Sequence, residues 1–545
     1  MAIVQLAFLT TPLVGILLLT HVSIGEKRAS PNHPTLIYCY ILAFQILLAS
    51  MWRVFIKPLL FSQYKDIPEP SGGSFINGHF GYIMSMGNGE AELRWLEKIP
   101  NNGMLRCRGL LNVERIIVTS PTALAKIATD TFIFVKPNIL RLLAGRVLGL
   151  GLVLVNRDVH KQQRKLFLPP FAPKHIHDLT PTFWRKSREV TEKMCIEIRG
   201  DTNSSRAVLE IGEWAARVAL DIITLTGMGK DFGAVQNQNA PLATVYMKVL
   251  EPTLGHVVVA ILKGLFPARL VEALPIKSNH DQANAMHTIR GVCRRLLQEK
   301  KEKKSDSKDI LNVCLKYGEI AGVNEEEVID QMTTFLGAGH ETISVGITWA
   351  VYMFSIHQEW QQKIRAEIRS TMPALDHPMM ERTRVETLPL LRAFIEEVLR
   401  WYPPIPTTMR EPFADTELDG HLIAKGTRII VPIKAINREE KFWGPDSREF
   451  KPERWLKDSN TFDSTGGVTT KYGHLSFMQG PRSCIAAGFA RAEMVCILAV
   501  WVARFGFDLA DERFRDEKNM ETSGGNLSAK PLHGMRVQVR LLDGW

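Results

Sequence analysis

Apolar side chains dominate the first 52 residues, in two stretches that carry no formal charge. Residues 3–24 are long enough to cross a bilayer as a helix, which takes about 20 residues. Residues 35–52 are shorter, and they predict either a second span or a helix that lies in the membrane interface. A cleaved signal peptide is the alternative for the first stretch, but residues 1–5 lack the positive charge that such a peptide carries. We therefore predict a membrane anchor over residues 1–64, with one span or two.

Basic residues and a hinge-like segment follow the apolar stretches. Arg53, Lys57 and Lys65 come after the second stretch, and basic residues beside a membrane segment favour its cytosolic side. Residues 65–80, KDIPEPSGGSFINGHF, combine prolines that stiffen the chain with glycines that let it turn sharply. This segment is typical of a hinge, and we expect a cytosolic catalytic domain over residues 65–545.

The rest of the chain shows mostly the 3.6-residue period of amphipathic helices. Two runs rich in β-branched residues, 105–121 and 427–439, predict short strands. The clearest helix begins at Asn324, a good N-cap with Glu327 three positions later, and its apolar pattern continues to about His357. A helix that long and that apolar must run through the core. The expected fold class is mainly α with small β-sheets.

The middle of that helix contains residues that a core helix would avoid. The sequence FLGAGHETIS places two glycines in the helix interior, where each costs about 1 kcal/mol relative to alanine. One interpretation is a close helix crossing, with Thr342 bonded back to a carbonyl of its own helix. The other is a groove in which Ala338 and Gly339 let a bulky planar ligand approach, while Glu341 and Thr342 handle protons. The clustering of small and polar residues favours the groove.

Composition narrows the class of protein. The 545 residues carry a net charge of +10, and the sequence pI is about 9.2. The basic residues do not gather in one long run with aromatic residues between them, so nucleic acid is not an expected partner. Seven cysteines at wide spacings, with no CxxC pair, argue against a disulfide framework and against structural zinc.

A candidate charge network lies in the C-terminal half. Glu397 and Arg400 form an ExxR pair on one helix face, which by itself is usually a surface salt bridge of little energetic value. Arg454, in the sequence KPERW, can complete a network with both residues, and the flanking tryptophans and prolines predict that this network is buried. A buried network of this kind fixes geometry more than it adds stability.

The most specific pattern is LSFMQGPRSC, which contains the spacing F-x-x-G-x-R-x-C and ends at Cys484. The cysteine can supply a thiolate ligand that the N-terminus of the following helix stabilises. Gly480 permits a tight loop around the sulfur, and Phe477 can shield the sulfur from water. Arg482 can pair with an acidic group on a cofactor. Because no partner Cys or His lies nearby, the pattern indicates a metal that a macrocycle already holds.

Four motifs in this order make the chain resemble the cytochrome P450 family of haem-thiolate monooxygenases: AGHET, EVLR, PERW and FMQGPRSC. The resemblance covers nearly everything from residue 65 onward. It implies the cytochrome P450 fold and haem b with Cys484 as the axial ligand. It also implies that arginines bind the haem propionates, and the matching residues are Arg164, Arg410 and Arg482. His160 stands where the family often has tryptophan, and a histidine can also donate to a propionate.

The resemblance further implies a reaction and its partners. A microsomal eukaryotic member is anchored in the endoplasmic reticulum membrane and receives electrons from a separate NADPH-cytochrome P450 reductase. We accordingly expect a monooxygenase that inserts one oxygen atom of O2 into a lipophilic small molecule, similar to fungal enzymes that act on terpenoid or polyketide intermediates of secondary metabolism. Two alternatives stay open, a haem-thiolate isomerase, dehydratase or peroxygenase and a non-catalytic membrane haem carrier. Retention of Glu341 and Thr342 favours dioxygen activation.

The substrate pocket is expected to be apolar. The stretches expected to line it are residues 139–155, 335–339, 405–409 and 522–525. Residues 254–270 predict either a lipophilic access region near the membrane or a plain core helix. The glycosylation sequons at Asn203 and Asn526 are expected to be idle, because a cytosolic domain does not meet the glycosylating enzyme.

Overall fold

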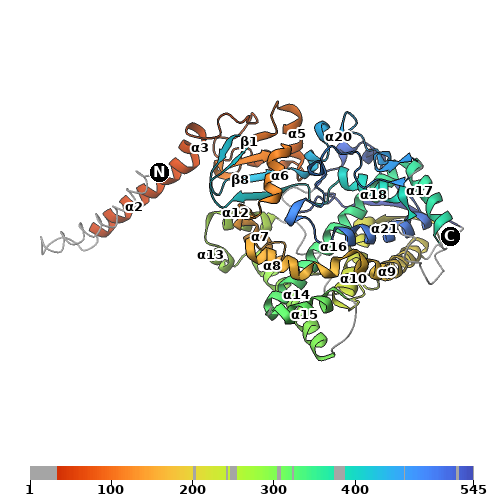
Figure 1. The fold of residues 1–545 in the computed structure, drawn as a ribbon. Helices are drawn as coiled ribbons and strands as arrows, with labels where there is room; N and C mark the ends of the chain where they lie inside the picture. The colour runs from red at the N-terminus through yellow and green to blue at the C-terminus, as the bar shows by residue number, and fades with distance from the viewer. Residues whose placement is uncertain are drawn as a thin grey trace. The chain divides into compact units, whose positions relative to one another are not determined.

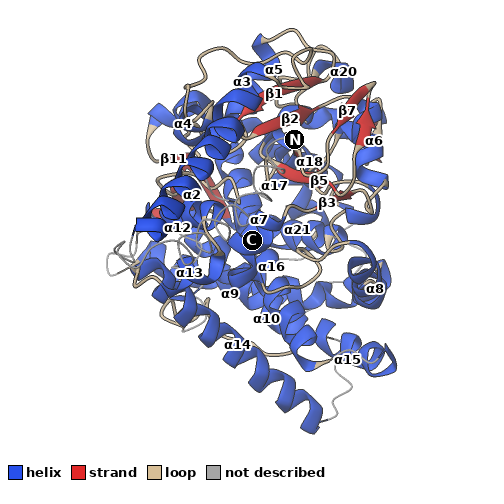
Figure 2. Cartoon of the chain, turned by 90° about the vertical axis from the view of Figure 1, so that its left-hand side faces the viewer, coloured by secondary structure: helices blue, strands red, loops and turns tan. Residues whose placement is uncertain are grey.

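The computed structural model describes residues 33–200, 204–240, 244–245, 254–303, 309–321, 324–372, 387–458, 461–522 and 527–543. The chain forms two compact units, Met1–Tyr82 with Met104–Ile116 and Ile83–Gly103 with Ile117–Trp545. Figure 2 shows that helices make up most of the described chain and that the strands are confined to small sheets, as predicted. The expected first membrane span, residues 3–24, lies outside the described residues.

The helices and strands are labelled in chain order. The α-helices are α2 (His33–Met51), α3 (Lys57–Leu60), α4 (Phe80–Ser85), α5 (Glu90–Lys98), α6 (Pro121–Thr129), α7 (Asn138–Leu148), α8 (Arg157–Phe167), α9 (Pro173–Arg199), α10 (Ile211–Met228), α12 (Leu254–Leu265), α13 (Ala268–Ala273), α14 (Lys277–Lys303), α15 (Ile310–Ala321), α16 (Glu325–Ile356), α17 (Gln358–Thr371), α18 (Pro389–Trp401), α19 (Ile433–Ile436), α20 (Glu440–Trp443) and α21 (Ala487–Arg504). The strands are β1 (Met104–Arg108), β2 (Glu114–Val118), β3 (Phe134–Val135), β4 (Arg206–Glu210), β5 (Thr408–Pro412), β6 (Thr416–Leu418), β7 (His421–Ile423), β8 (Arg428–Val431), β9 (Leu456–Lys457), β10 (Thr461–Phe462), β11 (Phe505–Leu509) and β12 (Arg536–Leu541).

The described part of the first unit begins with an apolar helix. α2 continues through a π-helical turn, Trp52–Ile56, into α3. Among the described residues, the stretch Cys39–Leu60 is the one helix whose length and composition would let it cross a membrane, and it is not buried in the protein. The second predicted apolar stretch is therefore helical, and the helix extends beyond the expected end at residue 52.

The proline- and glycine-rich segment that predicts a hinge is hydrogen-bonded to β1 and to the turn after it. The Glu69 carboxylate accepts a hydrogen bond from Arg106 Nε at 3.0 Å. The buried carboxamide of Asn112 donates to the carbonyl oxygens of Val54 at 3.0 Å and of Phe75 at 2.6 Å. These bonds fix the segment within the first unit, so its prolines and glycines serve tight turns and not a loose joint.

In the second unit, the 32-residue helix α16 runs among other helices (Figure 1). Its start is as predicted, because Asn324 Oδ1 accepts a hydrogen bond from the Glu327 backbone N–H at 2.9 Å. It ends at Ile356, next to the predicted end. Helices α10, α18 and α21 pack against it, and its large side chains Trp349 and Phe354 are fully buried. The prediction of a helix through the core is confirmed.

Small antiparallel sheets flank the helices of the second unit. β5 pairs with β8, with Thr408 opposite Val431, and also with β3, with Phe134 opposite Pro412. β12 lies between β11 and β4, while β6 pairs with β7 and β9 with β10. The predicted strand over residues 427–439 is shorter than expected. β8 ends at Val431 because the next residue, Pro432, has no N–H to donate to a sheet, and the chain then enters α19.

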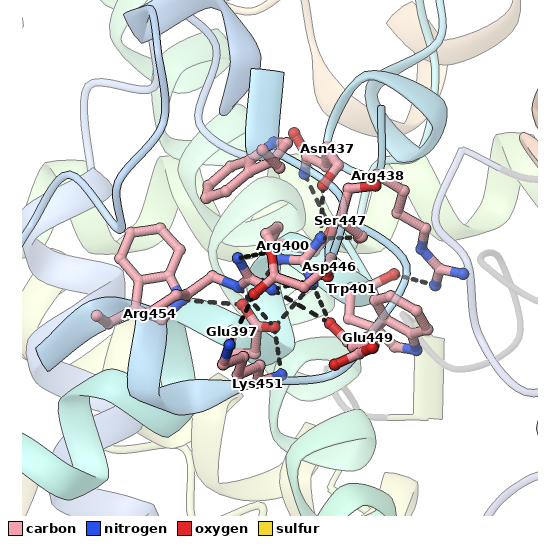
Figure 3. Close-up of polar contacts among 12 residues, drawn as sticks. Glu397, Arg400, Trp401, Asn437, Arg438, Asp446, Ser447, Glu449, Lys451 and Arg454 are labelled. Carbon is pink, nitrogen blue, oxygen red and sulfur yellow. Dashed lines mark hydrogen bonds and ion pairs between the residues drawn. The ribbon is translucent and has the colours of Figure 1, made fainter. Parts of the chain in front are cut away.

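A buried charge network joins α18 to the segment after α20 (Figure 3). Glu397 and Arg400 are fully buried and form a bidentate ion pair with two N–O distances of 2.7 Å. The same carboxylate accepts from Arg454 at 3.1 Å, from Trp455 at 2.9 Å and from the Lys451 backbone N–H at 2.7 Å. Burial alone would raise the pKa of Glu397, but the hydrogen bond and charge of Arg400 and the charge of Arg454 lower this pKa below its ordinary value. The three predicted partners meet, and their burial excludes a surface salt bridge.

Arg400 also holds the backbone that leads to the predicted cysteine loop. Its guanidinium donates to the carbonyl oxygen of Asn437 at 2.8 Å (Figure 3). The Asn437 side chain in turn accepts from the Leu475 N–H at 2.9 Å and donates to Ser476 Oγ at 2.9 Å. Because Leu475 and Ser476 begin the loop, the network fixes its base.

Loss of Arg400 is expected to destabilise the protein strongly. Arg400→Met leaves the Glu397 carboxylate buried with one cation fewer, and breaking a buried pair costs about 3–5 kcal/mol. The matched control is Arg515→Met, which removes an exposed arginine from the same i, i+3 arrangement with Glu512 and should cost less than about 1 kcal/mol. The comparison is made by urea denaturation followed by circular dichroism. Equal losses for the two variants would contradict the role given to the network.

Candidate active site

The loop before Cys484 folds tightly because of one glycine. Gly480 has a φ of +75°, which is left-handed, and a Cβ there would lie 2.5 Å from the carbonyl oxygen of Ala128 in α6. The Cys484 backbone N–H donates to the carbonyl oxygen of Phe477 at 2.8 Å. α21 begins at Ala487, so the cysteine lies directly before a helix N-terminus, as predicted.

Many protein atoms surround the Cys484 thiol, yet its side chain is solvent-accessible. Burial raises the pKa of its thiol, while the Ala486 N–H and the charges of Arg164 and Arg491 act in the opposite direction. The side chain is nevertheless exposed, so a ligand can reach the sulfur. Coordination to a metal ion deprotonates a thiol outright. The described residues contain no group of three or more His, Cys, Asp or Glu side chains that could hold a metal.

Phe477 connects the loop to α21. The Arg491 guanidinium carbon lies 4.3 Å from the centre of the Phe477 ring, and Arg491 Nη2 donates to the buried Glu396 carboxylate at 3.0 Å. Burial would lower the pKa of Arg491, but Glu396 and the Cys484 sulfur raise it. The sequence pattern predicts Phe477 at this loop, and it gives no sign of Arg491 or Glu396.

Four cationic side chains gather next to the loop. Arg164, on α8, donates to the carbonyl oxygen of Ser483 at 2.7 Å. Burial, followed by the charges of Arg410 and Arg164, lowers the pKa of Arg482 to about 9. Burial also lowers the pKa of Arg410, on β5, to about 10. The pKa of Lys136 falls well below its ordinary value through burial and the charges of Arg410 and Arg482. We call Lys136, Arg164, Arg410 and Arg482 the cation cluster.

His160, on α8, lies beside the cation cluster and is buried. Burial, followed by the charges of Arg482 and Arg164, lowers its pKa to about 3. The imidazole is therefore neutral at physiological pH. A neutral imidazole still carries one N–H donor, which is what the family resemblance expects at this position.

No described carboxylate compensates the cation cluster. In the described part of the chain no ion pair to Asp or Glu involves these four residues, and the one acidic group that acts on their pKa values is the Cys484 thiol, which opposes the lowering of the Arg164 pKa by burial. Buried charges are normally paired, and guanidinium groups suit carboxylates because both are planar. A cofactor with two carboxylates beside a thiolate-bound metal supplies the charge that the protein lacks. The residues present therefore fit haem with its propionates.

Two residues of this region carry no signal in the sequence. Lys136 follows β3, and continuing the β3–β5 register places it opposite Arg410. The Asn156 carboxamide accepts from the Lys136 N–H at 3.0 Å, donates to the Lys136 carbonyl oxygen at 3.1 Å and accepts from Arg482 at 2.9 Å. Both residues depend on contacts between segments far apart in the chain, which a local pattern does not reveal.

The groove expected on α16 is present in part. Between residues 336 and 355, the residues that are not buried are Ala338, Gly339, Glu341 and Thr342. Thr342 Oγ1 donates to the Ala338 carbonyl oxygen at 2.8 Å, the back-bonding of the first interpretation. A Cβ on Gly339 would lie 2.8 Å from Ile223 of α10. This close helix crossing supplies one reason for Gly339, and the approach of a ligand to the same glycine stays a prediction.

One of the stretches expected to line a pocket lies against α16. The loop after α7 is fixed to this helix, because the Leu152 N–H donates to Gln331 Oε1 at 3.0 Å and Thr334 Oγ1 donates to the Leu148 carbonyl oxygen at 2.6 Å. Residues 523–526, which include most of the last stretch, lie outside the described residues. The apolar segment over 254–270 forms α12 and part of α13, and it exposes Phe266 and Leu270. It is therefore not a plain core helix.

The comparisons with known proteins all point to the same protein family. The cytochrome P450 family model matches residues 79–534. The chain is similar to cytochrome P450 monooxygenase buaD of Petromyces alliaceus, with 60% identity over 507 residues and 92% of each chain covered. It is also similar to cytochrome P450 monooxygenase sphH of Aspergillus fumigatus (34% over 510 residues, 91% of each chain) and to cytochrome P450 monooxygenase FUM15 of Gibberella moniliformis (33% over 554 residues, 92% of each chain).

These matches agree with the geometry of the cysteine loop and the cation cluster. The family model covers most of the second unit, including the cysteine loop, and the relatives extend along nearly the whole chain. The prediction made from the four motifs is confirmed. This chain belongs to the cytochrome P450 family and is a haem monooxygenase.

Proposed function

We propose that this protein is anchored in the endoplasmic reticulum membrane and inserts one oxygen atom of O2 into a lipophilic intermediate of secondary metabolism, such as a terpenoid or polyketide. The observation that carries the proposal is the accessible Cys484 thiol beside one buried and three half-buried cations, none of which has a described carboxylate partner. That combination suits a dianionic cofactor whose metal takes a sulfur ligand. The apolar loop after α7 supports a lipophilic substrate.

Each residue then has a separate task. Cys484 would hold haem b through its sulfur, and Arg164, Arg410, Arg482 and Lys136 would pair with its propionates; the haem would supply dioxygen binding and electron transfer. The N–H of His160 would add a donor to a propionate. Thr342 exchanges its hydrogen bond with the Ala338 carbonyl for one with a water molecule, and Glu341 supplies protons to that water.

The second unit supplies neither the membrane anchor nor the electrons for the reaction. The apolar helix Cys39–Leu60 supports an anchor over residues 1–64, with the catalytic domain over residues 65–545 in the cytosol. A separate NADPH-cytochrome P450 reductase delivers the electrons. The net charge of +10 favours docking against an acidic face of that reductase.

Removal of the cysteine is expected to abolish the reaction. Protein reconstituted with reductase, NADPH and a panel of terpenoids and polyketides should transfer one atom of 18O2 to a product, as mass spectrometry detects. Cys484→Ala should give no such product, and its reduced, carbon-monoxide-treated form should lack the red-shifted Soret band of thiolate-ligated haem. The control Cys39→Ser changes the other exposed cysteine of the described residues and should behave as wild type. A Cys484→Ala protein that keeps the band would overturn the proposal.

Substitution of a cluster cation is expected to have opposite effects on haem-free and haem-loaded protein. Arg410 is 3% exposed, and burial lowers its pKa to about 10, which corresponds to about 3 kcal/mol of unfavourable charge burial. Arg410→Met should therefore raise the urea midpoint of the haem-free protein. The loss of a charge-assisted bond to a propionate, about 1.5–3 kcal/mol, should weaken haem binding roughly 10- to 100-fold in a titration.

The matched control for that change is Lys434→Met. Lys434 is also buried, but its Nζ lies 2.8 Å from Glu90 Oε2, so it has a carboxylate partner. Its removal should lower the urea midpoint and leave haem affinity unchanged, because Glu90 loses Lys434 and retains the more exposed Arg94 as a cationic partner. A haem-free Arg410→Met protein that is less stable than wild type would count against an uncompensated cluster.

The topology predicts how the protein behaves in microsomes. It should stay in the membrane pellet after an alkaline carbonate wash, because the anchor is apolar. Added protease should digest the catalytic domain in sealed vesicles, and treatment with an endoglycosidase should not change the mobility of the full chain. Glycans on Asn203 or Asn526 would place this domain on the lumenal side and refute the topology.

A further inference from the structure

The Glu341 carboxylate, on α16, is held by a segment near the C-terminus of the chain. Its Oε1 atom accepts a hydrogen bond from Ser528 Oγ at 2.7 Å and lies 2.9 Å from Lys530 Nζ. Thr342, the next residue, donates instead to the Ala338 carbonyl oxygen. Consecutive side chains on a helix point about 100° apart, so the Glu341 and Thr342 side chains face different parts of the protein.

The segment that holds Glu341 is itself fixed to the core, and we call residues 528–530 the strap. Trp349 Nε1, two turns after Glu341 on the same face of α16, donates to the Ala529 carbonyl oxygen at 2.8 Å. The Ala529 N–H donates to the Pro404 carbonyl oxygen at 2.9 Å, just after α18. These two backbone bonds fix the position from which the strap reaches Glu341.

The strap also connects Glu341 to solvent. Ser528 is buried, whereas the Lys530 side chain is 33% exposed and the Glu341 side chain 13%. The other ionisable neighbour is His340, which is buried and whose pKa burial lowers, although the charge of Glu341 opposes this effect. His340 Nδ1 contacts the Leu336 carbonyl oxygen of its own helix at 2.7 Å. Lys530 is thus the partner of Glu341 that bulk water reaches.

We propose that Ser528 and Lys530 are positioning residues that hold the Glu341 carboxylate between turnovers and release it to carry protons inward. In each exchange the carboxylate leaves Lys530, takes one proton from solvent, gives that proton to a water molecule beside Thr342 and returns to Lys530 as an anion. Lys530 keeps its own protons throughout. This inference rests on the proposed function, in which Glu341 and Thr342 supply protons for monooxygenation.

The contact itself is tested by thermal unfolding of the full-length, haem-loaded protein, which needs no substrate. Lys530→Met and Glu341→Gln should each lower Tm by about 1–3 °C, and the double variant should fall no further than the larger single loss. The control pair Lys230→Met and Glu299→Gln removes an exposed ion pair of 3.2 Å and should change Tm by less. Fully additive losses for Lys530 and Glu341 would show that the strap does not hold the carboxylate, and would overturn the proposal.

The positioning role is tested by coupling, measured as product formed and hydrogen peroxide released per NADPH consumed. Lys530→Met should lower product per NADPH about tenfold, raise peroxide and increase the solvent deuterium isotope effect, because proton delivery becomes slow. Lys530→Arg should restore coupling to within about twofold, and Lys530→Met should add little to the loss of Glu341→Gln. Lys230→Met should couple as wild type.

Two outcomes separate failure of the inference from failure of the proposed function. If Glu341→Gln loses coupling but Lys530→Met and Ser528→Ala couple as wild type, the strap has no positioning role and the proposed function stands. If Glu341→Gln itself couples as wild type, Glu341 carries no protons, and both the assignment of Glu341 and the role of the strap are wrong.

Discussion

The organisation of the second unit depends on like charges that are held close together, one of them buried and three half-buried. Lys136, Arg164, Arg410 and Arg482 come from separate segments, and each gives up hydration without gaining a carboxylate from the described chain. Such a cluster persists only where the surrounding fold holds it in place or a bound anion neutralises it. The proposed propionates would do the second. Cofactor binding and the stability of this region are then linked, because a ligand that binds only the folded state adds its binding energy to folding.

The network around Glu397 shows the opposite electrostatic arrangement. One buried carboxylate receives bonds from Arg400, Arg454, Trp455 and a backbone N–H, so its charge is satisfied without any ligand. Through Asn437 the same network fixes the base of the cysteine loop. The loop is thus organised before a cofactor arrives, while the cation cluster is completed only by one. A site built this way places its sulfur accurately and still gains binding energy from the ligand.

Local patterns predicted those parts of the site that lie within one loop or one helix. Gly480 left a clear signal because a left-handed φ and the close approach of a carbonyl both require glycine there. Lys136 and Asn156 left none, since their roles arise from the pairing of β3 with β5 and from a contact 20 residues apart. Gly339 could not be assigned one cause, because a glycine within a helix gives the same sequence signal whether its neighbour is a ligand or Ile223. Fold class was easier to predict, because helical periodicity extends over most of the chain.

The side chains proposed to handle protons already have partners within the protein, and those partners differ in strength. Thr342 bonds to a carbonyl of its own helix, a neutral hydrogen bond with a net value of about 0.5–1.5 kcal/mol, so a water molecule can replace that partner at little cost. Glu341 has a hydroxyl and an ammonium group on one oxygen, and bonds to charged groups are worth about twice as much. Release of the carboxylate is therefore the harder exchange. It follows that the fold can control proton delivery at the carboxylate, through the strap, more effectively than at the hydroxyl.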